Sequence, residues 1–188
     1  CTILKAQVQG QDEQAARQAR YRVMREYINQ GDVLMLAHHA DDQAETVLMR
    51  LIQGAGIKGL AAMQPWREHI HQSQQDQHYT LWRPWLTVTR AAISDYAKQL
   101  QLPYIDDPTN ASGDNVRSGL RRDIMPKLVS YNANVIGNVA RSAQLLSEAQ
   151  AIVEAQAEQD LQTTAIKSLE FASAQRVLAI DKLHDLST

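Results

Sequence analysis

One short stretch, residues 33–52, constrains the fold of this chain more than any other. It reads VLMLAHHADDQAETVLMRLI: an apolar run, then two histidines and three carboxylates, then apolar residues at helical spacing. A short apolar run that gives way to a period of 3.6 residues is typical of a buried strand followed by a helix. We therefore expect a strand over 32–37 and a helix that starts near Asp41 and ends at Gly54 and Gly56. Such units build parallel sheets, which bind ligands where their strands end.

Other elements are predicted from the same periodicities. Short apolar runs indicate strands at 2–8, 59–63, 79–82 and 103–105, and the polar stretch 68–78 is interpreted as a solvent loop. Helices are expected over 12–30, 90–100 and 134–159, and Pro126 should interrupt a helix over 116–128. Thr89 should cap the helix at 90–100. The side chains expected to face the core of the first three helices are Ala16, Ala19, Val23, Tyr27, Ala44, Val47, Leu48, Leu51, Ile52, Ala92, Ile93, Tyr96, Ala97 and Leu100.

Composition narrows the classes of function. The chain has 188 residues, 44% of them apolar, which is enough for a real core. Its single cysteine excludes an internal disulfide, a Cys-only metal site and a Cys-x-x-Cys redox pair, so a cytoplasmic location is expected. No apolar run approaches the roughly 20 residues of a membrane helix. With a net charge of −2, a nucleic-acid partner would need a local basic patch, and 116–128 offers four cationic residues against one carboxylate.

The polar residues at the strand–helix junction are the main candidate site. They are His38, His39, Asp41, Asp42 and Glu45. Asp41 and Glu45 lie one helical turn apart, toward the apolar face, where a carboxylate is costly unless it is paired or binds a metal. Capping of the helix by Asp41 would explain one carboxylate but not the whole cluster. Two chemistries fit: a divalent-metal site for phosphate or water activation, and a nucleotide site in which Mg²⁺ bridges carboxylates and phosphates.

Five motifs, taken in order, resemble one known family. They are ARQARY (16–21), HHADDQAET (38–46), QGAGIKGLAAM (53–63), LWRPWLTVTRAAISDYA (81–97) and LPYIDDPTN (102–110). In this order and spacing they resemble the tRNA(Ile)-lysidine synthetases, bacterial enzymes of the N-type ATP pyrophosphatase (PP-loop) group. The resemblance covers about residues 2–126. It implies an α/β fold with a parallel sheet of the PP-loop (adenine-nucleotide alpha-hydrolase-like) type, followed by a long helix and the start of a second small domain.

The resemblance also implies a reaction. Enzymes of this family use ATP to adenylate the C2 carbonyl oxygen of the wobble cytidine in tRNA(Ile) with anticodon CAU. Pyrophosphate leaves, and the amine of free L-lysine then attacks C2 to give lysidine. The implied cofactors are ATP and Mg²⁺, and the implied partners are tRNA(Ile) and L-lysine. We expect no membrane partner, and a homodimer is an open expectation.

The resemblance assigns roles to residues of this chain. His38 and His39 would form the nucleotide and cytidine pocket, and Asp41, Asp42 and Glu45 would bind lysine or Mg²⁺, with Asp42 and Glu45 as the metal ligands. Arg17 and Arg20, together with His39, would face the phosphates or the adenylated intermediate. The pocket mouth or the tRNA backbone would be contacted by Arg83, Arg90, Asp107, Asn110, Arg117 and Arg121. Ordinary surface charge is the competing interpretation for Arg83 and Arg90.

Two departures from the family pattern matter. The 188 residues contain no Ser-Gly-Gly-x-Asp-Ser nucleotide loop, and the chain opens on Cys1 inside a predicted strand. We therefore expect a fragment that is inactive by itself, because the backbone N–H groups of that loop cradle the phosphates. Ser118 stands where the family usually has asparagine.

Alternatives to the lysidine reaction stay open. One is a metal-dependent hydrolase that uses His38, His39 and Asp42, and another is a tRNA-binding module without activity. Related sulfur-transfer enzymes commonly rely on cysteine pairs, which this chain lacks. We expect three parts: a partial PP-loop domain over 1–128, a connecting helix over 129–160 that is preferred to a coiled coil, and the start of a substrate- or tRNA-binding domain over 161–188.

Overall fold

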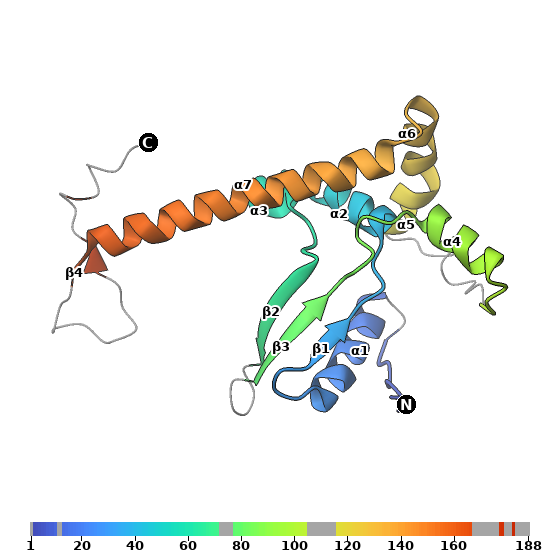
Figure 1. Cartoon of the computed structure of the whole chain (residues 1–188), viewed down its shortest axis with the longest axis horizontal. Coiled ribbons are helices and arrows are strands. Elements are labelled where there is room, and N and C mark those ends of the chain that lie inside the picture. Colours follow the sequence, from blue (N-terminus) through green and yellow to red (C-terminus); the bar gives the residue numbers. More distant parts are fainter. Residues whose placement is uncertain are drawn as a thin grey trace.

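A three-stranded sheet forms the centre of the fold. The computed structural model describes residues 2–10, 13–71, 77–104, 116–166, 177–178 and 182. Strands β1 (Val33–Met35), β2 (Trp66–His71) and β3 (Gln77–Trp82) lie in the order β1-β3-β2. β1 runs parallel to β3, with Leu34 opposite Leu81, and β2 forms an antiparallel hairpin with β3. This mixed sheet with its parallel pair confirms the predicted α/β class (Figure 1).

Helices surround the sheet at one end and along one side. Helix α1 (Glu13–Tyr27) precedes β1, and the N–H of Gly31 in the connecting turn donates to the carbonyl of His78 at 2.8 Å. Figure 1 places the remaining helices beyond the carboxyl ends of β1 and β3. These are α2 (Ala40–Ile52), α3 (Ile57–Leu60), α4 (Arg90–Gln99), α5 (Val116–Gly119), the π-helical turn η2 (Leu120–Ile124), α6 (Met125–Tyr131) and α7 (Val135–Thr164), after which β4 (Ala165–Ile166) pairs with β5 (Val177–Leu178).

The two faces of the sheet differ in burial. Tyr79 and Leu81 project from one face and are 7% and 3% exposed. Residues opposite one another in the register share a face, so Met35, Trp66 and Trp82 lie on the other face. Met35 and Trp66 are more than half exposed there, and Trp66 stacks on Trp82 with ring centroids 4.9 Å apart. The described core therefore lies on one side of the sheet only.

Helix α2 organises the segment that follows it. The Gln43 side chain is 4% exposed and forms two hydrogen bonds with the backbone of Met63, accepting from its N–H at 3.0 Å and donating to its carbonyl at 2.9 Å. The Arg50 guanidinium donates to the carbonyl of Gly59 at 2.7 Å. These bonds hold α3 and the turn after it, where Ala62 adopts a φ of 53°, against α2.

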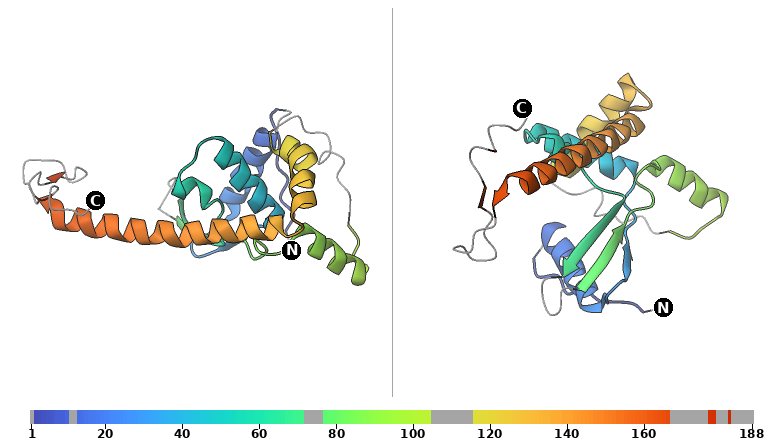
Figure 2. Two further views of the ribbon diagram at one scale, coloured as in Figure 1. Left: turned by 90° about the horizontal axis from the view of Figure 1, so that it is seen from above. Right: turned by 60° about the vertical axis from the view of Figure 1, so that its left-hand side comes forward.

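Helix α7 packs on α2 and α3 through its first half. Ala143 is fully buried there, and the Ser147 hydroxyl lies 2.9 Å from the side-chain oxygen of Gln64. The second half extends well beyond the rest of the fold in every view (Figures 1 and 2), and Ile152 is 72% exposed. Within the described parts of the chain, no helix is long and apolar enough to cross a membrane.

Several predicted elements are confirmed. The strand near 32–37, the strand at 79–82 and the helices at 12–30, 90–100 and 134–159 are all present, with shifted ends. The start of α2 differs by one residue from the prediction near Asp41. Thr89 caps α4 by accepting from the N–H of Ala92 at 3.2 Å. The helical stretch at 116–128 is interrupted by η2, and Pro126 lies in the first turn of α6, where it displaces no helical hydrogen bond.

Other predicted elements are wrong. Residues 2–8 form no strand, since their backbone pairs with none of the described strands. They lie along α1, where the Tyr27 hydroxyl donates to Thr2 at 3.2 Å. The stretch 59–63 contains the end of α3 and a turn rather than a strand. Most of the supposed loop at 68–78 belongs to the β2–β3 hairpin, whose Trp–Trp and His–Tyr stacking offsets its polar composition. The strand at 103–105 is absent at 103 and 104, and residue 105 lies outside the described residues.

Some predicted core residues are also exposed. The apolar stripe of α2 holds for Ala44 and Val47 but fails at Leu51 and Ile52, which are 56% and 71% exposed because they lie past the sheet edge. The prediction is also wrong for Tyr27 of α1 and for Ala92, Tyr96 and Leu100 on or next to α4, which are exposed because no described segment covers them.

Candidate active site

The candidate site begins where β1 ends. His39 is the N-cap of α2: its Nδ1 accepts from the N–H of Asp42 at 3.4 Å, and the Asp42 carboxylate accepts from the N–H of His39 at 3.1 Å. This reciprocal pair satisfies two backbone donors that a helix start leaves free. The sequence analysis offered Asp41 as the cap of this helix, but the residue that caps it is His39.

Asp41 has a different structural role. Its Oδ2 accepts from the backbone N–H of Arg90 at 2.7 Å, 49 residues further along the chain. The N–H of Ala40 also donates to the carbonyl of Val88 at 2.9 Å. Together these bonds fasten the start of α4 to the start of α2. A carboxylate at the first N–H groups of α4 is also favoured by the helix dipole.

Glu45 is the most deeply buried ionisable side chain of the cluster, with 2% exposure. Arg117 Nε donates to its Oε2 at 2.9 Å, and Arg121 donates through Nε at 2.7 Å and through Nη2 at 2.9 Å. Both arginines come from the α5–η2 segment, more than 70 residues away in sequence. The two arginines thus satisfy the carboxylate completely, as a buried charge requires.

Asp42 completes this charge cluster. Its Oδ1 lies 3.8 Å from Arg117 Nη2 and 3.9 Å from Arg121 Nη2, and its backbone carbonyl accepts from the Thr46 hydroxyl at 2.7 Å. Two carboxylates therefore face two guanidinium groups, and the cluster is close to neutral.

Arginine side chains contact both of the predicted Mg²⁺ ligands, Asp42 and Glu45. The oxygens of Glu45 already accept short hydrogen bonds from guanidinium groups, and one oxygen of Asp42 caps α2. In the described ranges, no group of three or more His, Cys, Asp or Glu side chains is arranged to hold a metal ion. Mg²⁺ binding by Asp42 and Glu45 would require these arginines to give up the oxygens, and the metal assignment stays a prediction. This geometry gives no support to the hydrolase alternative.

A second group of side chains lies beside this cluster. His38 follows β1 and Arg83 follows β3, and because these strands are parallel the two residues lie at the same edge of the sheet. Arg83 is only 8% exposed; its Nη1 donates to the carbonyl of Gln64 at 2.9 Å, and its buried Nε has no partner among the described residues. Arg17 lies over the ring of Tyr21 at 5.5 Å.

The charge state of His38 follows from its surroundings. Burial lowers the pKa of the His38 imidazole below 6.5, and nearby Asp42 opposes this shift only in part. Arg83, Arg117 and Arg17 add to the lowering of this pKa. Burial likewise lowers the pKa of Arg83 from its usual value. These surroundings favour the neutral form of the imidazole, and the buried Nδ1 of His38 has no partner in the described part of the chain.

The structure brings most of the predicted site residues together. Asp42 and Glu45 contact Arg117 and Arg121 directly, His39 joins this cluster through Asp42, and Asp41 bonds to the backbone of Arg90. Arg83, Arg117 and Arg17 lie close enough to His38 to lower its pKa. Arg20 is exposed on α1 instead of turning inward. Asp107 and Asn110 lie outside the described residues.

Three contributors escaped the sequence analysis. Gln43 and Thr46 are polar residues on α2, a helix that was predicted from the spacing of its apolar residues alone. Gln64 lies in the segment between α3 and β2. Gln43 lies outside the arc of α2 that the apolar residues define, so its burial has no signal in the periodicity. Their roles depend on contacts between segments far apart in sequence, which periodicity does not reveal.

The fold and this site define the chain as a member of the PP-loop domain family, whose family profile matches residues 1–128. Among curated proteins, it is similar to the tRNA(Ile)-lysidine synthase of Psychrobacter sp. (strain PRwf-1), with 41% identity over the whole of this chain and 38% of that protein. The tRNA(Ile)-lysidine synthases of Pseudomonas aeruginosa and Pseudomonas syringae pv. tomato are 42% and 41% identical over 82% and 79% of this chain. The chain spans about a third of the length of these relatives.

Proposed function

We propose that this protein modifies tRNA by joining L-lysine to C2 of the wobble cytidine of tRNA(Ile) with anticodon CAU, in the cytoplasm. ATP would first adenylate the C2 oxygen with release of pyrophosphate. The lysine amine would then attack C2, and AMP would leave with that oxygen. The observation that carries the proposal is that Asp42 and Glu45 of the HHADDQAET motif, on the helix that follows β1, contact Arg117 and Arg121, and that β1 is parallel to β3.

The two groups of side chains suit the two halves of this reaction. Arg83, Arg17 and the neutral His38 offer donors at the sheet edge, which favours binding of phosphate groups. Asp42 and Glu45 are carboxylates whose arginine partners could be exchanged for the cationic amine of lysine. We also propose that the chain divides into a PP-loop domain at 1–128, a connecting helix at 129–160 and the start of a further domain from 161. Self-association as a homodimer is part of the same proposal.

Incorporation of labelled L-lysine into tRNA tests the proposal, with the protein at its full encoded length. We expect ATP-dependent incorporation that Asp42→Ala abolishes. Glu45→Gln keeps the volume of the side chain and should abolish incorporation as well. The matched control is Glu154→Gln, an exposed carboxylate on α7 that pairs with Lys58 at 3.3 Å. Normal incorporation by folded Asp42→Ala and Glu45→Gln proteins would refute the assignment of the site.

A binding module without activity would give a different result. It would bind tRNA with an affinity that falls steeply with salt, and ATP and lysine would change nothing. Pyrophosphate release measured with and without lysine therefore separates the two functions.

A further inference from the structure

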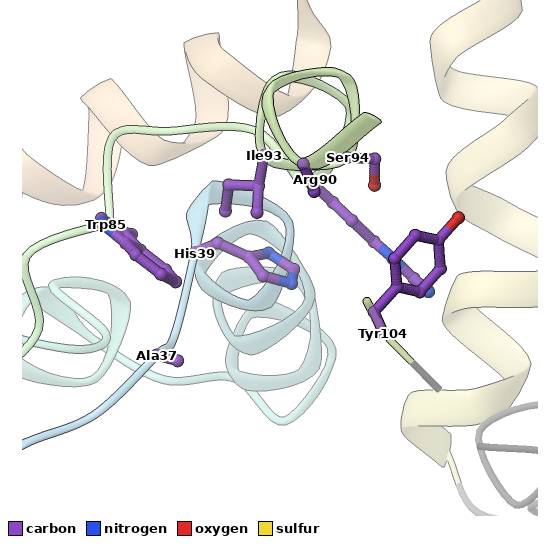
Figure 3. Close-up of a pocket in the computed structure, with 8 residues that line it drawn as sticks. Ala37, His39, Trp85, Arg90, Ile93, Ser94 and Tyr104 are labelled. Atoms are coloured by element: carbon purple, nitrogen blue, oxygen red, sulfur yellow. The ribbon is translucent and has the colours of Figure 1, made fainter. Parts of the chain in front are cut away.

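A pocket lies beside the charge cluster and is not explained by it. Its volume is about 320 Å³, and it lies between the β1–α2 junction and α4. His39, Trp85, Arg90, Ile93, Ser94 and Tyr104 contribute most of its wall (Figure 3). Trp85, Ile93, Ser94 and Tyr104 have no role in the reaction proposed above.

The pocket is held in a fixed position by the contacts already described. His39 is fixed by the capping box of α2, and the N–H of Arg90 is fixed by Asp41 at 2.7 Å. The Thr89 side chain caps the first turn of α4, from which Arg90, Ile93 and Ser94 project. Two of the lining residues, His39 and Arg90, are therefore connected to the junction that carries the carboxylate cluster.

Two large aromatic side chains border this pocket and remain open to solvent. Trp85 is 45% exposed and Tyr104 is 62% exposed. Figure 3 shows them on opposite sides of His39, with the side chain of Arg90 extended toward Tyr104. Exposed aromatic rings in a pocket are the usual stacking surfaces for unpaired bases of RNA, because every base has a π face.

The polar groups of the pocket match the rest of a nucleotide. In the described part of the chain, the Arg90 guanidinium forms no ion pair, so its charge is available to a phosphate group. The Ser94 hydroxyl can donate to or accept from a base edge. A double-stranded RNA cannot use this pocket, since its bases are stacked inside the helix.

We propose that this pocket binds one unpaired nucleotide of an RNA substrate, with its base stacked on Trp85 next to Ile93 and its phosphate bound by Arg90. The inference rests on the proposed function, since it assumes that the substrate is a tRNA. It adds a site for an unpaired base beside the carboxylate cluster, which would help place the loop of that tRNA.

The test compares two RNAs in binding to the protein at its full encoded length: a stem-loop with an unpaired loop, and a blunt duplex of the same stem. The wild type should bind the stem-loop more tightly. Trp85→Leu should weaken binding of the stem-loop by about tenfold or more and leave the duplex unaffected. Trp85→Phe should restore most of the preference, because it restores an aromatic face.

The matched control is Trp66→Leu, which removes an exposed indole on the sheet, away from the pocket. Tyr104→Leu provides a second pocket variant, and circular dichroism verifies that each variant is folded. An unchanged preference for the stem-loop in both folded pocket variants would overturn the inference. So would a loss of ATP affinity in Trp85→Leu without a loss of RNA affinity, because the pocket would then hold the adenine of ATP.

Failure of the proposed function would be seen separately. If the wild type incorporates no lysine but binds the stem-loop through Trp85, the reaction is refuted and the pocket stands. If lysine is incorporated and the pocket variants bind the stem-loop like the wild type, the pocket inference alone fails.

Discussion

At the scale of single residues, Glu45 illustrates why a buried charge needs partners. Its carboxylate is 2% exposed and accepts from two guanidinium groups that reach it from a distant segment. Sequence analysis could identify the carboxylate as costly and therefore as a site residue. It could not identify Arg117 and Arg121 as the partners, because more than 70 residues separate them from Glu45. The sequence indicates a carboxylate that must be paired or bind a metal, and in the structure two arginines pair with it.

Removal of Glu45 should be strongly destabilising. Glu45→Ala leaves Arg117 and Arg121 partly buried without their carboxylate, and we expect a loss of about 3 kcal/mol in the free energy of unfolding. Chemical denaturation measures this loss. The control Glu154→Gln, at an exposed ion pair, should leave the free energy of unfolding unchanged. Equal stability of Glu45→Ala and wild type would contradict the described cluster.

His38 should make the fold sensitive to acid. Because burial lowers its pKa below 6.5, the unfolded chain binds a proton on His38 at a higher pH than the folded chain does. The free energy of unfolding should therefore decrease as the pH falls below 6.5, and His38→Gln should reduce this decrease. Denaturation curves at pH 7 and pH 5.5 measure the effect. His78→Gln, at an exposed position of β3, is the control, and identical pH dependence in both variants would disprove the role of His38.

At the scale of elements, helices were predicted well and strands less well. The strong periodicity of α1, α2 and α7 depends on local sequence, whereas a strand exists only if a neighbour pairs with it. Residues 2–8 alternate like a strand but are held by the side chains of α1, and β2 has polar residues yet pairs with β3 along its length. A pairing strand is present for β2 and absent for residues 2–8, and this difference, not composition, determines which of them is a strand.

Gln43 should be the main connection between α2 and the segment after α3. Gln43→Ala removes both hydrogen bonds to Met63 and leaves buried backbone groups without partners, at a cost of about 2 kcal/mol. Thermal or chemical unfolding measures this cost. Gln144→Ala removes a hydrogen bond on the exposed face of α7 and should have little effect. A similar decrease in the free energy of unfolding in both variants would show that the bonds to Met63 stabilise the fold no more than an exposed hydrogen bond does.

At the scale of the whole molecule, α7 divides into a packed half and an exposed half. Ala143 is buried against the rest of the fold, whereas Ile152 and Val153 are 72% and 53% exposed. The sequence predicted the helix but not this division, because the heptad-like spacing continues along both halves. Exposure of apolar residues on a helix that extends beyond the fold follows from the geometry in Figure 2.

Hydrogen exchange should detect this division. Helical segments without tertiary packing open more easily, so amides in 152–160 should exchange faster than those in 139–147. Mass spectrometry of peptides from the two halves provides the comparison within a single protein. Equal protection along α7 would mean that the second half is covered in solution.

The proposed reaction places the residues that follow β1 and β3 in a lysidine-forming active site. The most direct measurement is nucleoside mass spectrometry of tRNA(Ile) after incubation with ATP, L-lysine and the protein at its full encoded length. We expect that the wobble cytidine is replaced by a nucleoside that carries lysine, and that Asp42→Ala leaves cytidine unmodified. Unmodified cytidine with the wild type would refute the proposed reaction, and lysidine with Asp42→Ala would refute the role of Asp42.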